Sequence, residues 1–151
     1  MKYLKALLLS AVLASLTPMA YAADQVKVHD AWIPQAPPVA GVMAAYMVVE
    51  NTGSKPVTIT GVDCNEFGMV MMHKTVTENG VSRMIHLGDL KLAPKSKAVF
   101  HRGGMHVMLM QPKHAFKVGD KVPMTLELAD KHKIKFTAVV KPASMDVDKT
   151  H

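Results

Sequence analysis

The sequence predicts an all-β domain, either a sandwich or a barrel, because three features agree. Short apolar or alternating runs recur along the chain, glycine, proline and asparagine separate them, and no segment keeps a helical period. The spacing of the turn signals is typical of an antiparallel sandwich or barrel. We expect nine strands, at 26–33, 42–50, 57–62, 69–76, 81–87, 98–101, 105–110, 122–128 and 134–140.

Turn residues define the first three strands. The first run ends in a stretch with adjacent prolines, Pro37 and Pro38, which no strand can cross. The second closes at Asn51 and Gly53, and the third begins after Pro56. The predicted strands in this part of the chain are therefore short and sharply bounded.

The remaining strands follow from the same signals. Asn79-Gly80 separates the fourth run from the fifth and strongly predicts a hairpin. Gly103 and Gly104 separate the sixth run from the seventh, and alternation alone predicts the last two strands.

The beginning of the chain is predicted to be an export signal. Lys2 and Lys5 precede a short apolar run, and 20–22 is a small-residue cleavage pattern. The apolar run is too short to span a bilayer. We expect residues 1–22 to be removed and the chain from Ala23 to be a soluble exported protein, without a membrane anchor.

The rest of the chain is predicted to form one domain over 23–142, followed by a polar and disordered tail at 143–151. Removal of the two signal-peptide lysines lowers the formal charge from +6 to +4. The other lysines are scattered, which argues against a nucleic-acid partner. Cys64 is the only cysteine, so no internal disulfide can form, and we expect this thiol to be buried and inert.

Histidine and methionine alternate in the segment 105–110. In a strand, His106, Met108 and Met110 would share one face, while Met105, Val107 and Leu109 would share the other and form core. The first face therefore carries an imidazole and a thioether two residues apart.

The predicted hairpin carries a second such pair. A four-residue loop at 77–80 would place His73 opposite Met84, and a two-residue loop would place Met84 opposite Thr75, diagonal to His73. Both registers leave His73 and Met84 on one face, because both loops are even in length and ladder partners project to the same side. A loop of odd length would separate them.

A metal could bridge His73 and Met84, and His106 and Met108 would complete a set of four ligands if their strand ends nearby. Two imidazoles and two thioethers are neutral and soft donors, which favours Cu(I) over zinc, calcium or magnesium. Thioethers have no proton to lose, so acid should weaken the site without abolishing it. Oxidation to Cu(II) should loosen it, because the harder ion prefers nitrogen and oxygen.

Simpler roles explain the other methionines and histidines. Methionine is a common core residue, and this is our expectation for Met43, Met47, Met69, Met72, Met105 and Met124. Solvated positions beside turns or charges are expected for His29, His101, His114, His132 and His151. Parity places three more residues near the site, either in support of the ligands or in surface or packing roles: Met71, His86 and Met110.

The spacing His73-x10-Met84-x21-His106-x-Met108 resembles the full H-x10-M-x21-H-x-M signature of the periplasmic copper chaperones called PCu(A)C. The blocks at 103–110 and 117–126 are similar to the family's core, and those at 30–33, 37–38, 44–46 and 50–53 to its amino-terminal landmarks. The resemblance covers essentially all of 23–142. Departures fall outside the ligands: Pro34 where a basic residue is expected, and Lys55-Pro56 in place of an acidic loop.

The resemblance implies a cupredoxin-like β-sandwich of Greek-key type that binds one Cu(I) through His73, Met84, His106 and Met108. It also implies delivery of copper to the CuA centre of cytochrome oxidase or to a thiol protein of the same assembly route, by a protein that we expect to be monomeric. Some members bind Cu(II) through a tail rich in histidine and methionine, but here the tail offers only Met145 and His151. The predicted mature start also lacks the third-position histidine of an amino-terminal Cu(II) site.

Four other functions compete with this one. A blue-copper electron carrier needs a cysteine thiolate beside its histidines, and Cys64 is not in the segment of His106. Copper sequestration without delivery needs the same four ligands and stays open as the alternative. A secreted structural module without metal is a weaker alternative. We do not expect an enzyme, because no activated nucleophile or paired carboxylates can be assembled.

Overall fold

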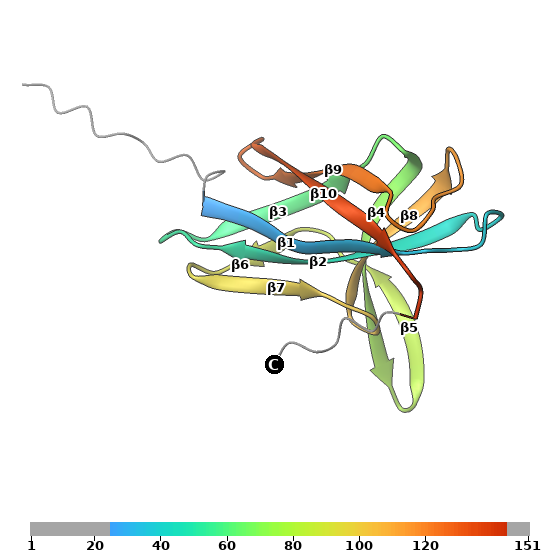
Figure 1. Ribbon diagram of the computed structural model, residues 1–151. Coiled ribbons are helices and arrows are strands. Elements are labelled where there is room, and N and C mark those ends of the chain that lie inside the picture. Colours follow the sequence, from blue (N-terminus) through green and yellow to red (C-terminus); the bar gives the residue numbers. More distant parts are fainter. Residues whose placement is uncertain (1–24, 145–151) are drawn as a thin grey trace, which may run out of the picture.

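The computed structural model describes residues 25–144, which form ten β-strands (Figure 1). Alternating apolar residues and intervening turns specify these strands, as the sequence predicts. The strands are β1 (Val26–Pro34), β2 (Val42–Asn51), β3 (Val57–Asp63), β4 (Phe67–Glu78), β5 (Val81–His86), β6 (Leu90–Leu92), β7 (Ser96–Phe100), β8 (Met105–Pro112), β9 (Lys121–Leu128) and β10 (Lys133–Lys141).

The predicted all-β class is confirmed, since no α-helix occurs within 25–144. All nine predicted strands are present with ends shifted by at most two residues. The prediction missed β6, whose three residues are too few to show alternation. The predicted export signal and all but two residues of the predicted tail lie outside the described residues and stay predictions.

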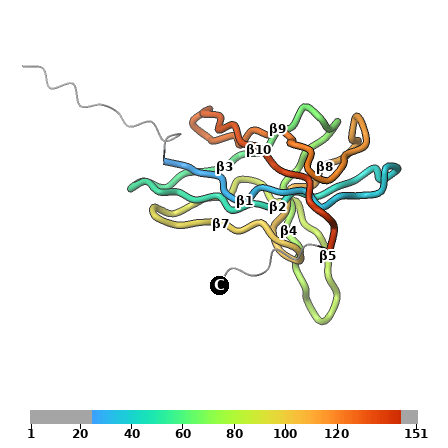
Figure 2. Tube along the Cα trace, in the orientation of Figure 1, coloured from blue at the N-terminus to red at the C-terminus, as the bar shows by residue number. Residues whose placement is uncertain are grey.

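The strands join into one sheet in the order β5-β4-β8-β7-β2-β1-β10-β9-β3-β6, with a further pairing of β8 with β2. The sheet curls around a shared interior, because β6, at one end of this order, contacts β7 near the other end. Figure 2 shows the result: β3, β9 and β10 lie along one side of β1 and β2, and β7 lies along the other. The β4–β5 hairpin projects beyond this body.

The core fills the space between the two halves of the curled sheet. Val49 on β2 and Leu109 on β8 are fully buried together with Ile59 on β3 and Leu126 on β9. Burial of each such side chain stabilises the fold by about 1.5–3 kcal/mol. The core therefore holds β2, β4 and β8 in place, and these strands position the hairpin.

Most predictions for the methionines are confirmed. Met43, Met47, Met72 and Met124 are buried, and Met105 is half-buried against the core. The prediction for Met69 is wrong, because its side chain is 45% exposed. Met69 has the same strand parity as His73, so it lies on the face of β4 that points away from the core.

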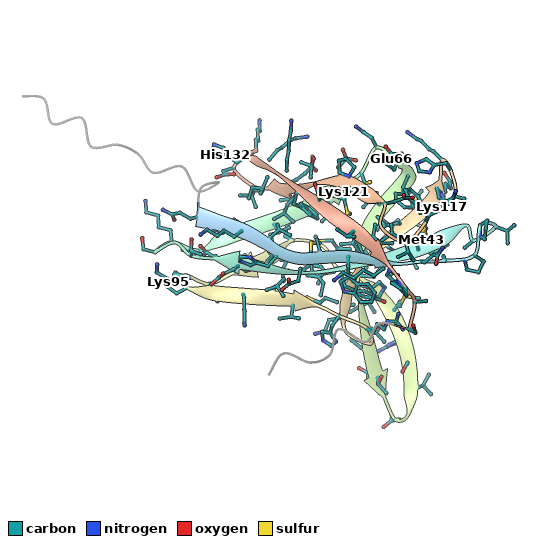
Figure 3. The ribbon with its side chains drawn as sticks, viewed as in Figure 1. Met43, Glu66, Lys95, Lys117, Lys121 and His132 are labelled. Carbon is teal, nitrogen blue, oxygen red and sulfur yellow. The ribbon has the colours of Figure 1, made fainter. Side chains whose placement is uncertain are left out.

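The charged side chains of residues 25–144 are spread over the surface of the body. Figure 3 shows Lys95 at one end of the body and Lys117 at the other, in keeping with the scattered lysines of the sequence. Several of the charges are paired at the surface, as Arg83 is with Glu78 and Lys133 with Glu127. Exposed pairs of this kind contribute little to stability.

Candidate metal centre

The β4–β5 hairpin has a two-residue turn. Glu78 pairs with Val81, and Asn79 and Gly80 have φ angles of 52° and 77°, the left-handed values that a tight hairpin of this type requires. Thr75 is therefore the partner of Met84. Of the two registers that the sequence left open, the structure has the one that places Met84 diagonal to His73.

Strand β8 lies antiparallel to β4 on the side away from β5 and brings the second pair alongside. His73 is directly opposite His106, and Met71 is directly opposite Met108. Since partners across a ladder project to one side, His73, Met84, His106 and Met108 all share a face. This is the face predicted from parity.

An open hollow of about 360 Å³ lies at the base of the hairpin, where three of these four residues meet. Met84, His106 and Met108 line it, and the ring centroid of His73 is 6.0 Å from that of His106. The other lining residues come from β2, from β4 and from the turn before β8: Val42, Met43, Ala44, Tyr46, Thr75 and Gly103.

No local pattern in the sequence placed residues from β2 at the site. They line the hollow because β2 pairs with β8, with Ala44 opposite Met108 and Val42 opposite Met110. That pairing joins segments more than 60 residues apart, and local patterns do not specify it. Apolar residues from β2 thus form one wall of a site whose polar groups come from β4, β5 and β8.

The imidazole of His106 is held in a defined orientation. It is 8% exposed, and its Nδ1 lies 3.1 Å from the carbonyl oxygen of Gly104. The same oxygen accepts a hydrogen bond from the backbone N–H of Thr75 at 3.0 Å, which ties the turn before β8 to β4. With Nδ1 engaged as a donor, Nε2 remains the nitrogen with a free lone pair for a metal.

His73 carries a buried polar atom that lacks a partner. Within residues 25–144, its Nδ1 is buried and makes no hydrogen bond. Such atoms are rare in folded proteins, and a bound metal ion would satisfy this one. Burial lowers the pKa of His73, and the neighbouring His106 and His86 lower it further. The ring therefore tends to stay neutral, which is the state that binds metals.

No three histidine, cysteine, aspartate or glutamate side chains of the described chain already surround a common point. A metal ion held by the two imidazoles as they stand would therefore take its further donors from thioether sulfur. The two methionines beside the two imidazoles supply it, and this mixed set is suited to Cu(I).

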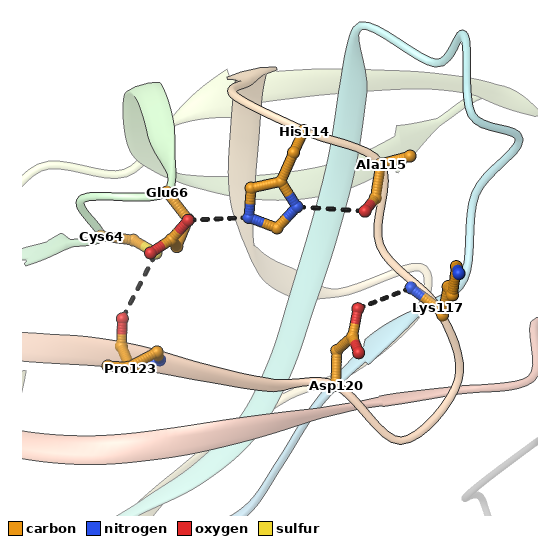
Figure 4. Close-up of polar contacts among 7 residues, drawn as sticks. All are labelled: Cys64, Glu66, His114, Ala115, Lys117, Asp120 and Pro123. Atoms are coloured by element: carbon orange, nitrogen blue, oxygen red, sulfur yellow. Dashed lines mark hydrogen bonds and ion pairs between the residues drawn. The ribbon is translucent and has the colours of Figure 1, made fainter.

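Cys64 and His114 belong to a different part of the molecule, which Figure 4 shows. Cys64 is buried, its Sγ donates to the carbonyl oxygen of Pro123 at 3.4 Å, and burial raises the pKa of its thiol. The predicted burial is thus confirmed. Cys64 does not line the hollow, so the arrangement offers no thiolate for a blue-copper centre.

The other histidines have partners away from the hollow. His114 lies 2.8 Å from Glu66 (Figure 4), and His29 lies 3.0 Å from Glu50. The backbone carbonyl of Ala115 and the carboxylate of Glu66 raise the pKa of His114. His101 and His132 lie beside turns, as predicted, and His151 lies outside the described residues.

Among residues 25–144, no helix has the length and apolar character required to cross a membrane.

Comparison with solved structures gives the class of the domain. The apo form of DR1885 from Deinococcus radiodurans is 27% identical, with a TM-score of 0.63 and 94% of each chain covered. Its Cu(I) form has a TM-score of 0.65 over 87% of each chain. The apo PCuAC domain of PmoF2, at 24% identity, shares the fold with a TM-score of 0.66, covering 83% of this chain and 96% of that domain. The cupredoxin-like fold of a PCu(A)C domain is therefore confirmed.

Sequence comparisons identify the family. The model of the LpqE-like family, described as putative lipoprotein LpqE-like, matches residues 26–140. A putative lipoprotein of Leifsonia xyli is 33% identical over 109 residues, and an uncharacterized protein of Rickettsia prowazekii is 25% identical over 88 residues. These matches cover 72% and 58% of this chain but only 64% and 49% of the two relatives. The chain belongs to the LpqE-like family, which is the family of the PCu(A)C domains.

Proposed function

We propose that this protein is an exported Cu(I) carrier that holds one cuprous ion through His73, Met84, His106 and Met108. It acts by delivering the ion to a cuproprotein under assembly, such as the CuA centre of cytochrome oxidase or a thiol protein of that route, and not by catalysing a reaction. The observation that carries the proposal is the presence of two imidazoles and two thioethers on one face at the base of the hairpin.

The donor set favours the reduced ion. All four groups are neutral when they bind, so they offset none of the charge of the bound ion. A monovalent ion such as Cu(I) suits this set better than a divalent ion. The relative DR1885, which is 27% identical to this chain, has been solved in a Cu(I) form. Export is supported by the name putative lipoprotein carried by the Leifsonia relative. The compartment that we propose is the periplasm.

The four groups differ in their access to solvent in a way that suits release. His106 is 8% exposed, whereas Met84 is 56% exposed and lies on β5, the edge strand of the sheet. An acceptor thiolate or imidazole can therefore approach copper from the Met84 side, while His106 still holds the ion. Exchange of one ligand at a time lets the ion move without being released to water.

X-ray absorption on the Cu(I)-loaded full chain tests the ligand set directly. We expect about two nitrogen and two sulfur neighbours. A copper ion with only oxygen and nitrogen neighbours would contradict the proposal.

A transfer experiment tests delivery. Cu(I)-loaded protein is mixed with an apo CuA domain, and the rate of copper transfer is measured at several acceptor concentrations. A rate that rises with acceptor concentration indicates exchange within a complex. A rate fixed at that of copper release to a chelator would indicate sequestration without delivery, the alternative function.

A further inference from the structure

A third imidazole stands next to the proposed ligands. His86 on β5 is the direct partner of His73 on β4, and their ring centroids are 5.8 Å apart. His73 is in turn the direct partner of His106 on β8, with centroids 6.0 Å apart. His86, His73 and His106 therefore form a row across three adjacent strands, on one face of the sheet.

Both centroid separations suit two imidazoles that share one metal ion. A metal–nitrogen bond of about 2.0 Å places the ion roughly 3 Å from a ring centroid, so two rings on one ion have centroids about 5–6 Å apart. His73, the middle ring, is at such a distance from both neighbours. Its Nδ1 is the buried atom without a hydrogen-bond partner among residues 25–144.

We propose that His86 is an additional ligand for Cu(II) alone, so that the row His86–His73–His106 lets the same site bind copper in this oxidation state as well. This inference rests on the proposed function, because it concerns the same site. The harder Cu(II) ion prefers nitrogen to thioether sulfur. Three imidazoles give it a nitrogen-rich set, while the two thioethers remain available to Cu(I).

Binding through three nitrogens needs a movement of His86. The three rings do not already surround a common point. His86 is exposed and lies on the edge strand β5, which pairs only with β4 in the described sheet. Exposed side chains change rotamer within nanoseconds, so the ring of His86 can turn toward the ion that His73 and His106 hold.

Cu(II) titration of the full chain tests the inference, with electron paramagnetic resonance to count the bound imidazole nitrogens. The variant is His86→Asn, and the control is His114→Asn, which removes an exposed histidine far from the hollow. We expect three imidazoles on Cu(II) in the unmodified protein and in the control. We expect two in His86→Asn, with a loss of Cu(II) affinity of about tenfold or more.

Equal nitrogen counts and equal Cu(II) affinity in His86→Asn and the unmodified protein would overturn the inference. So would Cu(II) binding that persists unchanged in His73→Asn, because the ion would then be held elsewhere on the chain. Amide exchange across β4 and β5 verifies that each variant keeps the hairpin.

Cu(I) affinity, measured by competition with a chromogenic chelator, separates this inference from the proposed function. We expect His86→Asn to change Cu(I) affinity by less than about twofold, since His86 is not one of the four proposed Cu(I) ligands. A tenfold loss of Cu(I) affinity in His86→Asn would overturn the assignment of His86 to Cu(II). An unmodified protein that binds Cu(II) through three imidazoles but does not bind Cu(I) would overturn the proposed function alone.

Discussion

Glu78 and Val81 are direct partners across the β4–β5 hairpin, so Asn79 and Gly80 alone form the turn. This pairing sets the position of every residue of β5 relative to β4. It places Met84 opposite Thr75 and His86 opposite His73. The turn, 4 residues from Met84 in the chain, therefore determines which side chains of β5 face the proposed copper site.

Replacement of Gly80 by valine should weaken Cu(I) binding although it changes no ligand. Gly80 has a φ of 77°, a conformation that costs a β-branched residue roughly 1–3 kcal/mol. Because β5 is an exposed edge strand, this strain should open the hairpin locally and leave the core intact. We expect a loss of about tenfold in Cu(I) affinity, measured by chelator competition.

Gly80→Asn is the matched control, since asparagine tolerates positive φ. It should keep an affinity within about threefold of that of the unmodified protein. Amide exchange in 81–86 should increase in Gly80→Val and not in Gly80→Asn. Equal affinities for all three proteins would show that the hairpin register does not govern the site.

Removal of sulfur from the proposed ligands should affect copper binding and not folding. Met84→Leu and Met108→Leu nearly conserve volume, so the free energy of unfolding should change by less than about 1.5 kcal/mol. Cu(I) affinity should fall about tenfold or more in each, because leucine cannot bind copper.

Met69→Leu is the control for these two variants. Met69 lies on the same face of β4 and is 45% exposed. It pairs with Met110, however, which is two positions along β8 from the proposed ligand Met108. Its replacement should leave Cu(I) affinity unchanged. A similar loss in all three variants would point to a general effect of methionine on this face.

The pKa values of His73 and His114 should be shifted in opposite directions in the metal-free protein. Burial lowers the pKa of His73 below its usual 6.5, and hydrogen bonds to Ala115 and Glu66 raise the pKa of His114 above that value. An NMR titration of the ring protons would measure both in one sample. A His73 that titrates above His114 would contradict the environments described for both rings.

The two shifts affect stability with opposite sign. As the pH falls through about 6.5, the unfolded chain binds a proton at His73 before the folded chain does, so this residue reduces stability on acidification. His114 contributes stability that is complete below about 6.5 and is lost as the pH rises through its raised pKa. Unfolding of His73→Gln and His114→Gln over a range of pH would separate the two contributions.

Local patterns were sufficient for nine of the ten strands and for the common face of the proposed ligands. Alternation gives the parity of each strand, and an even loop keeps His73 and Met84 on one side whichever register forms. The same parity would have corrected the prediction for Met69, which shares the His73 face and not that of the buried Met72. Composition alone suggested core for both.

Local patterns could not predict how distant strands meet. The wall that Ala44 and Tyr46 provide depends on the pairing of β2 with β8, which the fold as a whole determines. The choice between the two hairpin registers depends on the φ angles of Asn79 and Gly80. Local patterns also did not show that a side chain of β2, Asn51, bonds to the end of the short β6.

Asn51 is fully buried at the end of β2. Its Nδ2 donates to the carbonyl oxygens of Lys55 at 2.8 Å and Ala93 at 3.1 Å, with Leu92 at 3.4 Å. Its Oδ1 accepts from the backbone N–H of Gly53 at 3.0 Å. One side chain thus satisfies backbone groups of the loop after β2 and of the end of β6.

Asn51→Ala should therefore lower the free energy of unfolding by about 2–4 kcal/mol, because three carbonyl oxygens, all at least partly buried, lose their donor. Asn51→Asp should cost more at neutral pH, since a buried carboxylate would face those same oxygens, and acid should recover part of the loss by protonating it. Urea unfolding at two pH values measures both effects. Cu(I) affinity should stay within about twofold in either variant, because Asn51 lies 5 residues along β2 from Tyr46, the nearest lining residue on that strand, which is about 17 Å. An Asn51→Ala protein as stable as the unmodified one would show that the loop and β6 hold their positions without this side chain.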